Sequence, residues 1–167
     1  MKKLVTLAFA AIALLSISCQ KDPIGGTAAQ AVSGEWYVTV DALDAASGEL
    51  LAEDPYHMGR IHILTYNTAA NESDKIIVDD LGNFWEFKVK VACDQNAMTF
   101  GNTAAVDNLD YDCQVLLTNG KITKDGALTA GKTPVDTIEF IVSFDDDDPD
   151  IAYKIHGIRY TGFEADE

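Results

Sequence analysis

The residues of this 167-residue chain that could do chemistry are three histidines, three cysteines and many carboxylates. His57, His62 and His156 form no His-x-x-x-His pair and no cluster with the spacing of metal ligands. We interpret them as isolated wall or surface residues. No Gly-x-Ser-x-Gly sequence is present, which argues against a serine nucleophile. The sequence therefore predicts no catalytic residue and no cofactor.

The densest group of carboxylates is the acidic segment Asp145–Asp150. Asp145, Asp146 and Asp148 offer the hard oxygen ligands that calcium prefers. The segment lacks the spaced Asp-x-Asp-x-Asp-Gly pattern of a calcium loop, and adjacent carboxylates point in different directions. The sequence therefore favours a solvated turn and predicts no metal, and these three residues stay weak calcium candidates.

Two cysteines, Cys93 and Cys113, lie within the body of the chain, and strand alternation places both on inward faces. An even pair in an exported domain favours a disulfide. Such a bridge would contribute roughly 3 kcal/mol to stability. Two reduced cysteines that pack as small apolar groups are the alternative. Strand pairing is not fixed by the sequence, so both states remain open.

The overall charge excludes two classes of partner. The chain has 12 Lys+Arg against 27 Asp+Glu, a formal charge of −15. Nothing in it could neutralise a run of nucleic-acid phosphates or hold anionic headgroups electrostatically. With 47% hydrophobic residues the chain is nevertheless typical of a globular protein. We expect membrane association through an anchor only, and the sequence identifies no protein partner.

The N-terminus has the pattern of a targeting segment. Lys2 and Lys3 precede the twelve-residue apolar stretch Leu4–Leu15, which is too short to span a membrane. The following Leu-Ser-Ile-Ser-Cys resembles a bacterial lipobox, although Ser16 stands where Leu is commoner. The pattern predicts removal of residues 1–18 and lipidation of Cys19, with an ordinary signal peptide as the alternative.

Residues 19–33 are predicted to be the lipidated cysteine and a flexible tether, because they contain Pro and Gly but no apolar periodicity. Gln20-Lys21-Asp22 resembles the surface-export signals of Bacteroides-type lipoproteins. We therefore expect an outer-membrane lipoprotein displayed on the cell surface, with the periplasmic side as the alternative.

The body, residues 34–167, shows the period-2 alternation of antiparallel strands and no convincing helix. About nine runs are separated by turn residues, and Asn119-Gly120 is predicted to be a hairpin turn. These runs are Trp36–Asp41, Arg60–Tyr66, Lys75–Val78, Trp85–Cys93, Ala97–Phe100, Tyr111–Leu117, Lys121–Thr123, Ile138–Phe144 and Ala152–Phe163. A sandwich or a barrel fits this pattern, and we favour an all-β barrel of 8–9 strands.

A small barrel can hold one ligand inside. The predicted inward faces then supply candidate lining residues, for which plain core packing is the alternative. They are Trp85, Phe87, Val89, Tyr111, Phe140 and Val142.

Several motifs resemble one known family. Gly34-Glu35-Trp36 places a Gly-x-Trp on the first strand, as lipocalin-like (calycin) barrels do. Together with Gly59-Arg60, Leu64–Thr68, Asp79–Trp85 and Tyr160–Phe163, it resembles the "lipid-binding putative hydrolase" family of Bacteroides-type lipoproteins. The resemblance implies a calycin-like barrel and, by the family's name, lipid binding.

The resemblance also implies a contact at the closed end of the barrel, where the Trp packs against an arginine of the last strand. Trp36 and Arg159 are the matching residues. No catalytic signature transfers to this chain.

Three functions therefore remain. The leading hypothesis is a non-catalytic lipoprotein whose barrel binds a lipid or other apolar small molecule. A hydrolase acting on a lipid or glycan would need a convergent Asp/Glu or Ser/His set with shifted pKa values. A structural or accessory subunit of a surface complex would need an exposed interaction patch.

Overall fold

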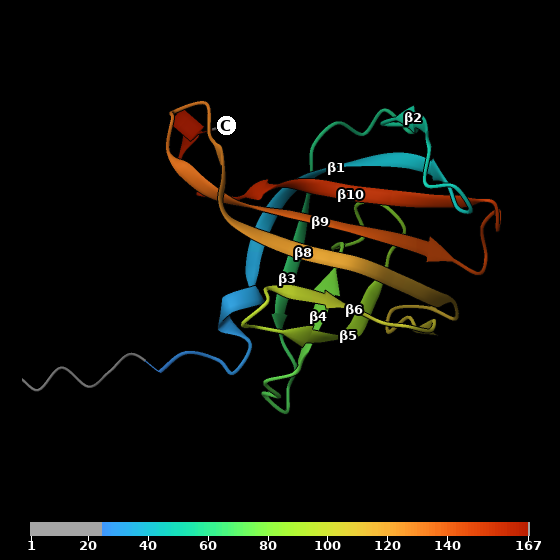
Figure 1. Cartoon of the computed structure of the whole chain (residues 1–167), viewed down its shortest axis with the longest axis horizontal. Helices are drawn as coiled ribbons and strands as arrows, with labels where there is room; N and C mark the ends of the chain where they lie inside the picture. Colours follow the sequence, from blue (N-terminus) through green and yellow to red (C-terminus); the bar gives the residue numbers. More distant parts are fainter. Residues whose placement is uncertain (1–24, 167) are drawn as a thin grey trace, which may run out of the picture.

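The computed structural model describes residues 25–166, which form one closed antiparallel β-barrel (Figure 1). This confirms the predicted all-β, calycin-like fold. The elements, in chain order, are η1 (Gln30–Val32), β1 (Gly34–Asp44), β2 (Leu50–Glu53), β3 (Ile61–Asn67), β4 (Lys75–Asp79), β5 (Lys88–Asp94), β6 (Thr99–Gly101), β7 (Val106–Asp107), β8 (Gln114–Leu128), β9 (Pro134–Phe144), β10 (Ile151–Arg159) and η2 (Glu164–Asp166).

The barrel closes because the first and last long strands pair with each other. The ladder of β1 with β10 runs from Trp36↔Arg159 to Asp44↔Ile151. Around the wall the order is β10-β9-β8-β6-β5-β4-β3-β1, while β2 lies outside this ring beside the second half of β1. The other edge of β1 pairs with β3 over its first half, Gly34 to Val38. Every described strand and the described core lie within residues 29–166, so a chain that starts at residue 20 retains every described contact.

The predicted alternation decides which side chains fill the interior. Trp36, Val38 and Val40 of β1 are at most 1% exposed, whereas Tyr37 and Thr39 between them face outward. The same alternation holds along β9, and side chains from all eight wall strands join one core cluster. Each large apolar side chain buried in this way contributes roughly 1.5–3 kcal/mol.

The predicted hairpin turn at Asn119-Gly120 is wrong, because β8 continues through both residues as a β-bulge. Thr118 pairs with Ile141 and Lys121 with Glu139, so three steps on β8 oppose two on β9. Asn119 has φ 55°, and a Cβ on Gly120 would lie 2.4 Å from the Phe100 carbonyl oxygen. The pair suits a bulge for the same reason that it suits a turn, since both need positive φ or a close backbone approach.

The strand predicted from Trp85 begins three residues later, at Lys88. Trp85 lies in the β4–β5 loop, whose backbone is held by the Asp80 carboxylate instead of a strand partner. The short strands β2 and β7 were not predicted, because neither carries an apolar alternation long enough to detect.

The predicted tether is too long at its C-terminal end. Ala29 and Val32 are 0% exposed and belong to the core cluster, and η1 places them against the end of the barrel. Apolar residues spaced three apart in one short 3₁₀ turn bury together without the longer periodicity that sequence analysis detects. The barrel domain therefore begins near residue 29. Cys19, like the whole predicted signal peptide, lies outside the described residues. Within residues 25–166, no helix is long and apolar enough to cross a membrane.

Candidate functional site: the two ends of the barrel

The closed end is sealed by the predicted pair, Trp36 and Arg159. The Arg159 guanidinium carbon lies 4.4 Å from the centre of the Trp36 ring, so a cation faces the indole. Trp36 donates its indole N–H to the Thr65 hydroxyl at 3.0 Å, and Thr65 donates in turn to the Val32 carbonyl at 2.8 Å. Asp136 accepts two guanidinium hydrogen bonds, at 3.1 and 3.3 Å. Every polar group around the indole is thus satisfied by the protein itself.

We call the opposite end the mouth, because its loops are held to one another across the barrel opening. The mouth consists of residues 44–60, 79–88, 107–114 and 145–150. Tyr56 meets Phe84, with ring centres 6.0 Å apart, and the Ala45 amide donates to the Asp150 carbonyl oxygen. The closed end, for comparison, consists of residues 25–33, 67–75, 94–99, 123–137 and 159–166.

Aromatic side chains from three of these loops and two strands gather over the mouth. Trp85 stacks on Phe144, with ring centres 4.9 Å apart and planes 14° apart. Phe84 meets Tyr153 edge to face at 4.9 Å, and Tyr56 lies 6.4 Å from Trp85. Offset and edge-to-face pairs of this kind are each worth about 0.5–1.5 kcal/mol beyond their buried area. Trp85 remains partly exposed and Tyr56 is 49% exposed, so the upper surface of this aromatic cluster faces solvent.

The acidic loop between β9 and β10 lies across the cluster and holds it through two carboxylates. Asp146 accepts hydrogen bonds from the Tyr111 hydroxyl at 2.8 Å, from the Trp85 indole at 3.2 Å and from the Cys113 thiol at 3.3 Å. These donors, the Tyr111 hydroxyl first, lower the pKa of Asp146 below its usual value. Burial, followed by the contacts with Cys113 and Asp146, raises the pKa of Tyr111. The loop therefore carries an ionised, exposed carboxylate at neutral pH.

The second carboxylate, Asp147, accepts the Tyr153 hydroxyl at 2.7 Å, and the Tyr153 and Tyr56 hydroxyls are 2.8 Å apart. Burial is the main cause that raises the pKa of Tyr153. This chain connects the buried Tyr153 on β10 with the exposed Tyr56 in the β2–β3 loop. Two loops of the mouth are thereby linked through one partly buried hydrogen-bond chain.

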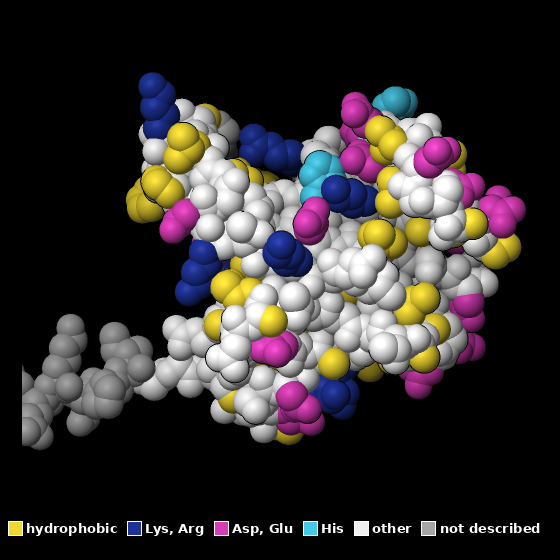
Figure 2. Space-filling view, viewed as in Figure 1, with side chains coloured by type: hydrophobic (Ala, Val, Ile, Leu, Met, Phe, Trp, Pro, Cys, Tyr) yellow, Lys and Arg dark blue, Asp and Glu magenta, His cyan; other side chains and the backbone are white. Residues whose placement is uncertain are grey.

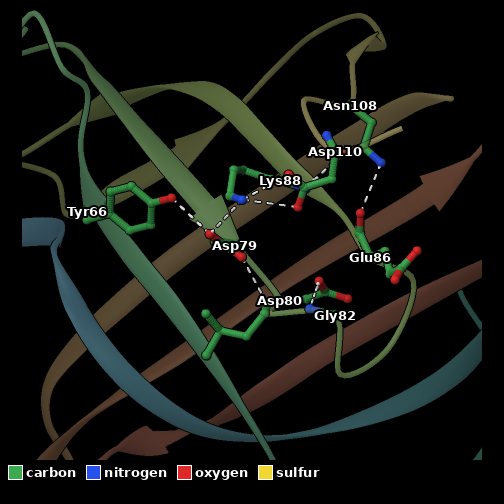
Figure 3. Close-up of polar contacts among 9 residues, drawn as sticks. Tyr66, Asp79, Asp80, Gly82, Glu86, Lys88, Asn108 and Asp110 are labelled. Carbon is green, nitrogen blue, oxygen red and sulfur yellow. Dashed lines mark hydrogen bonds and ion pairs between the residues drawn. The ribbon is translucent and has the colours of Figure 1, made fainter. Parts of the chain in front are cut away.

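A third polar group, Asp80, fixes the β4–β5 loop, and Figure 3 shows its contact with Gly82. Asp80 is 0% exposed and accepts the amides of Gly82, Phe84 and Trp85; burial raises its pKa despite these donors. Next to it, Asp79 accepts the Tyr66 hydroxyl at 2.9 Å. Because the carboxylate that holds the loop is buried, Phe84 and Trp85 are presented from a rigid base.

Lys88 links this base to the β7–β8 loop. Its ammonium lies 3.4 Å from Asp79 and 2.9 Å from Asp110, as Figure 3 shows. Burial first, and then the Asp79 contact, raises the pKa of Tyr66 to about 12. Contact with Asp110 raises the pKa of Lys88, so this cation is neutralised on both sides by acids of the same cluster.

The six predicted lining residues divide between the core and the mouth. Phe87, Val89, Phe140 and Val142 are 0–1% exposed and pack within the core. Trp85 and Tyr111 lie at the mouth and share Asp146 as acceptor. A groove of about 480 Å³ lies instead on the outer wall, where Leu43, Leu50 and Ile141 contribute apolar surface.

Sequence analysis did not connect Tyr56, Tyr153 and Phe144 with this site. The sequence does contain a signal that joins aromatic and acidic residues. Phe144 directly precedes the acidic segment, and Tyr111 stands between two aspartates.

Only two of the three weak calcium candidates lie together. Asp145 and Asp146 lie with Cys113 so that one ligand atom from each falls within 4.8 Å, but Asp148 is outside this group. Asp148 accepts the Asp150 amide and Asp145 accepts the Gln114 amide, so protein donors already occupy these oxygens. The carboxylates of this turn therefore accept hydrogen bonds from different parts of the chain.

Cys93 and Cys113 are both free thiols, so of the two states that the sequence left open the structure has the reduced one. Cys113 lies beside Asn108, and the next residue, Leu109, donates its amide to the Lys88 carbonyl at the start of β5. Cys93 lies five residues beyond Lys88 on β5, which places it roughly 16 Å from Lys88 along the strand. A bridge requires Cα atoms within about 7 Å. Burial raises the pKa of the Cys113 thiol to about 11, so it acts as a neutral donor.

One described place brings a hydroxyl, an imidazole and a carboxylate together on the outer wall. His156 Nε2 lies 2.9 Å from Asp41 and 3.3 Å from the Thr39 hydroxyl. A catalytic triad uses the two ring nitrogens for different partners, with one oriented by the acid and the other accepting the nucleophile's proton. Here one nitrogen serves both partners, so this arrangement is not a proton relay.

The fold and the mouth together define an antiparallel β-barrel with a sealed end and an aromatic end, the class of small barrel in which ligands bind at or within one opening. The family model described as "lipid-binding putative hydrolase" matches residues 21–164. The chain therefore belongs to that family, which confirms the resemblance found in its motifs. No curated protein matches the chain in sequence.

Proposed function

We propose that this protein is an envelope lipoprotein, anchored through Cys19, that binds a lipid or other apolar small molecule at the mouth of its barrel without chemical turnover. The observation that carries the proposal is the aromatic cluster of the mouth, in which Trp85 and Tyr56 present ring surface to solvent. Membership of a lipid-binding family supports the same role.

The packing of the interior supports a particular mode of binding. The core side chains below the mouth are buried, so the accessible apolar surface at this end is the aromatic cluster together with exposed leucines such as Leu81. An apolar chain would therefore enter by displacing the rings of Phe84 and Trp85 from Phe144 and Tyr153. Their loop is fixed at Asp80, so the rings can swing while the base stays in place.

The position of the chain ends supports the anchor. Residues 25–33 lie at the closed end, and the mouth lies at the opposite end (Figure 1). An anchor at Cys19 would therefore leave the mouth directed away from the membrane and open to ligand.

The lipid anchor is tested with Cys19→Ala. We expect this variant to lose labelled fatty-acid incorporation and membrane association, and retention of both would contradict the anchor. Protease access to the barrel in whole cells would distinguish surface display from the periplasmic side.

Ligand binding is tested by native mass spectrometry on residues 20–167 mixed with an extract of envelope lipids. We expect a reproducible adduct of lipid mass that is lost in Trp85→Ala. Phe163→Ala is the matched control, because Phe163 is a 69% exposed aromatic residue at the closed end. An unliganded mass with every lipid, or an adduct that survives Trp85→Ala, would contradict binding at the mouth.

A hydrolase is the second candidate, on the specific observation of Thr39, His156 and Asp41. It requires the imidazole to turn so that its two nitrogens face different partners. Ester hydrolysis that disappears in both Thr39→Val and His156→Ala would support it. Turnover unchanged in both variants would contradict it.

A further inference from the structure

Charge is distributed very unevenly between the two ends of the barrel. The mouth carries fifteen carboxylates against two basic side chains, whereas the closed end carries seven against four. In Figure 2 the acidic side chains crowd the right-hand end of the molecule, and most lysines and arginines lie to the left. The formal charge is thus −13 at the mouth and −3 at the closed end.

Neither basic residue of the mouth belongs to the aromatic cluster. Lys88 lies between Asp79 and Asp110. Arg60 lies 5.5 Å from the ring centre of Tyr37 and lines a notch on the outer wall together with His156. A carboxylate or phosphate head group that approached the mouth would therefore face like charge without a compensating cation.

The aromatic cluster, by contrast, is suited to a cation. Trp85 and Tyr111 stand on either side of the exposed carboxylate of Asp146, and Tyr56 extends the ring surface toward Asp147 through Tyr153. Ring faces attract ammonium groups, and they do so more strongly when the site is desolvated. Carboxylates beside the rings add Coulomb attraction of the same sign.

Two exposed leucines lie in the same loops as the aromatic side chains of the mouth. Leu81 and Leu109 are 49% and 57% exposed, and they flank the Asp79–Lys88–Asp110 group through backbone contacts. Large aliphatic side chains at this exposure offer surface to an alkyl chain. The mouth therefore combines an apolar track with a negative field, which selects a ligand that has an alkyl chain and a positive head.

We infer that the ligand of the mouth is a cationic amphiphile, an alkyl chain that carries an ammonium group. This inference rests on the proposed function and specifies its ligand class. The head group sits at Asp146 against Trp85 and Tyr111, and the chain lies toward Phe84 and Leu81. The field of the acidic end raises the local concentration of such cations and their association rate, and salt screens this effect.

The test uses three probes of equal chain length: dodecyltrimethylammonium, dodecanoate and dodecanol, each below its micellar concentration. Residues 20–167 are titrated while tryptophan emission is recorded, with Trp85→Phe identifying the responding indole. We expect the ammonium probe to bind at least about tenfold more tightly than dodecanoate at low salt. High salt should narrow that ratio.

Matched charge variants locate the effect. Asp146→Asn with Asp148→Asn removes two charges at the mouth, and Asp125→Asn with Glu164→Gln removes two at the closed end. We expect the first pair to abolish the preference for the ammonium probe and the second pair to leave it unchanged. Urea unfolding of each variant confirms that it remains folded.

Each outcome bears on a different statement. Equal or tighter binding of dodecanoate or dodecanol overturns the cationic head group and leaves lipid binding intact. Failure of all three probes to bind overturns the inference together with the proposed function. A preference that survives the mouth variants overturns the placement at Asp146.

Discussion

Each end of the barrel places an indole beside a charged side chain, and the two indoles differ in almost every other respect. Trp36 is 0% exposed, with Arg159 over its ring and Thr65 accepting its N–H. Trp85 is partly exposed and donates its N–H to an exposed carboxylate. A buried indole with fixed partners stabilises the fold. An indole whose partner faces water can exchange that partner at little cost, which is what a binding surface requires.

The largest expected difference between the two ends is in stability. Trp36→Ala should cost about 3–5 kcal/mol, because it removes a large buried side chain and leaves a cavity. Trp85→Ala should cost about 1–2 kcal/mol, because its ring already contacts water on one side. Urea unfolding measures both values. Equal losses of unfolding free energy in the two variants would show that Trp85 contributes as much to stability as Trp36.

A smaller effect should follow from the charge at the closed end. Arg159→Lys keeps the cation but loses the planar fork that contacts Asp136 and the Trp36 ring, so we expect a loss of about 1–2 kcal/mol. Lys154→Ala is the control, because the Lys154–Glu139 pair is exposed and should be worth less than about 0.5 kcal/mol. A larger loss in the control would contradict the view that the closed end depends on guanidinium geometry.

Acid should weaken the contacts that Asp146 makes at the mouth. The pKa of Asp146 is lowered chiefly by the Tyr111 hydroxyl, so its contribution is complete above the unfolded value of about 3.9 and is lost as pH falls through the lower folded value. The change in Trp85 emission that depends on Asp146 should therefore appear below about pH 4. The change should be absent in Asp146→Asn. An acid change of the same size in Asp146→Asn would contradict the assignment.

The smallest effect should appear in thiol reactivity. Cys93 is partly exposed, while Cys113 is 5% exposed and its pKa is raised by burial to about 11. Alkylation near pH 8 should therefore modify Cys93 first, and Asp146→Asn should speed the modification of Cys113 by freeing its loop. Peptide mass mapping over time measures both rates. Equal rates in the native protein would mean that the mouth opens more readily than the contacts of Asp146 indicate.

Much of the wall could be predicted, since alternation such as Trp36, Val38 and Val40 follows directly from the two-residue period of a strand. The bulge at Asn119-Gly120 could not, because positive φ serves a turn and a bulge equally, and long-range pairing with β9 selects between them. Among the lining candidates, the sequence identified Trp85 and Tyr111 but could not separate them from core residues such as Phe140. The inward orientation of a side chain follows from the local strand alternation. Its depth within the barrel depends instead on which other strands and loops pack over that side chain.

What the sequence determined by itself is therefore the all-β class, the family motifs, the acidity and the identity of the inward faces. These depend on residue type and short-range periodicity, which the chain carries before it folds. Only the tertiary structure decided that Trp85, Tyr111 and Cys113 would share Asp146, that the cysteines would stay apart, and that most of the charge would gather at one end. Those facts depend on antiparallel pairing and closure between β1 and β10, which bring together loops up to about a hundred residues apart.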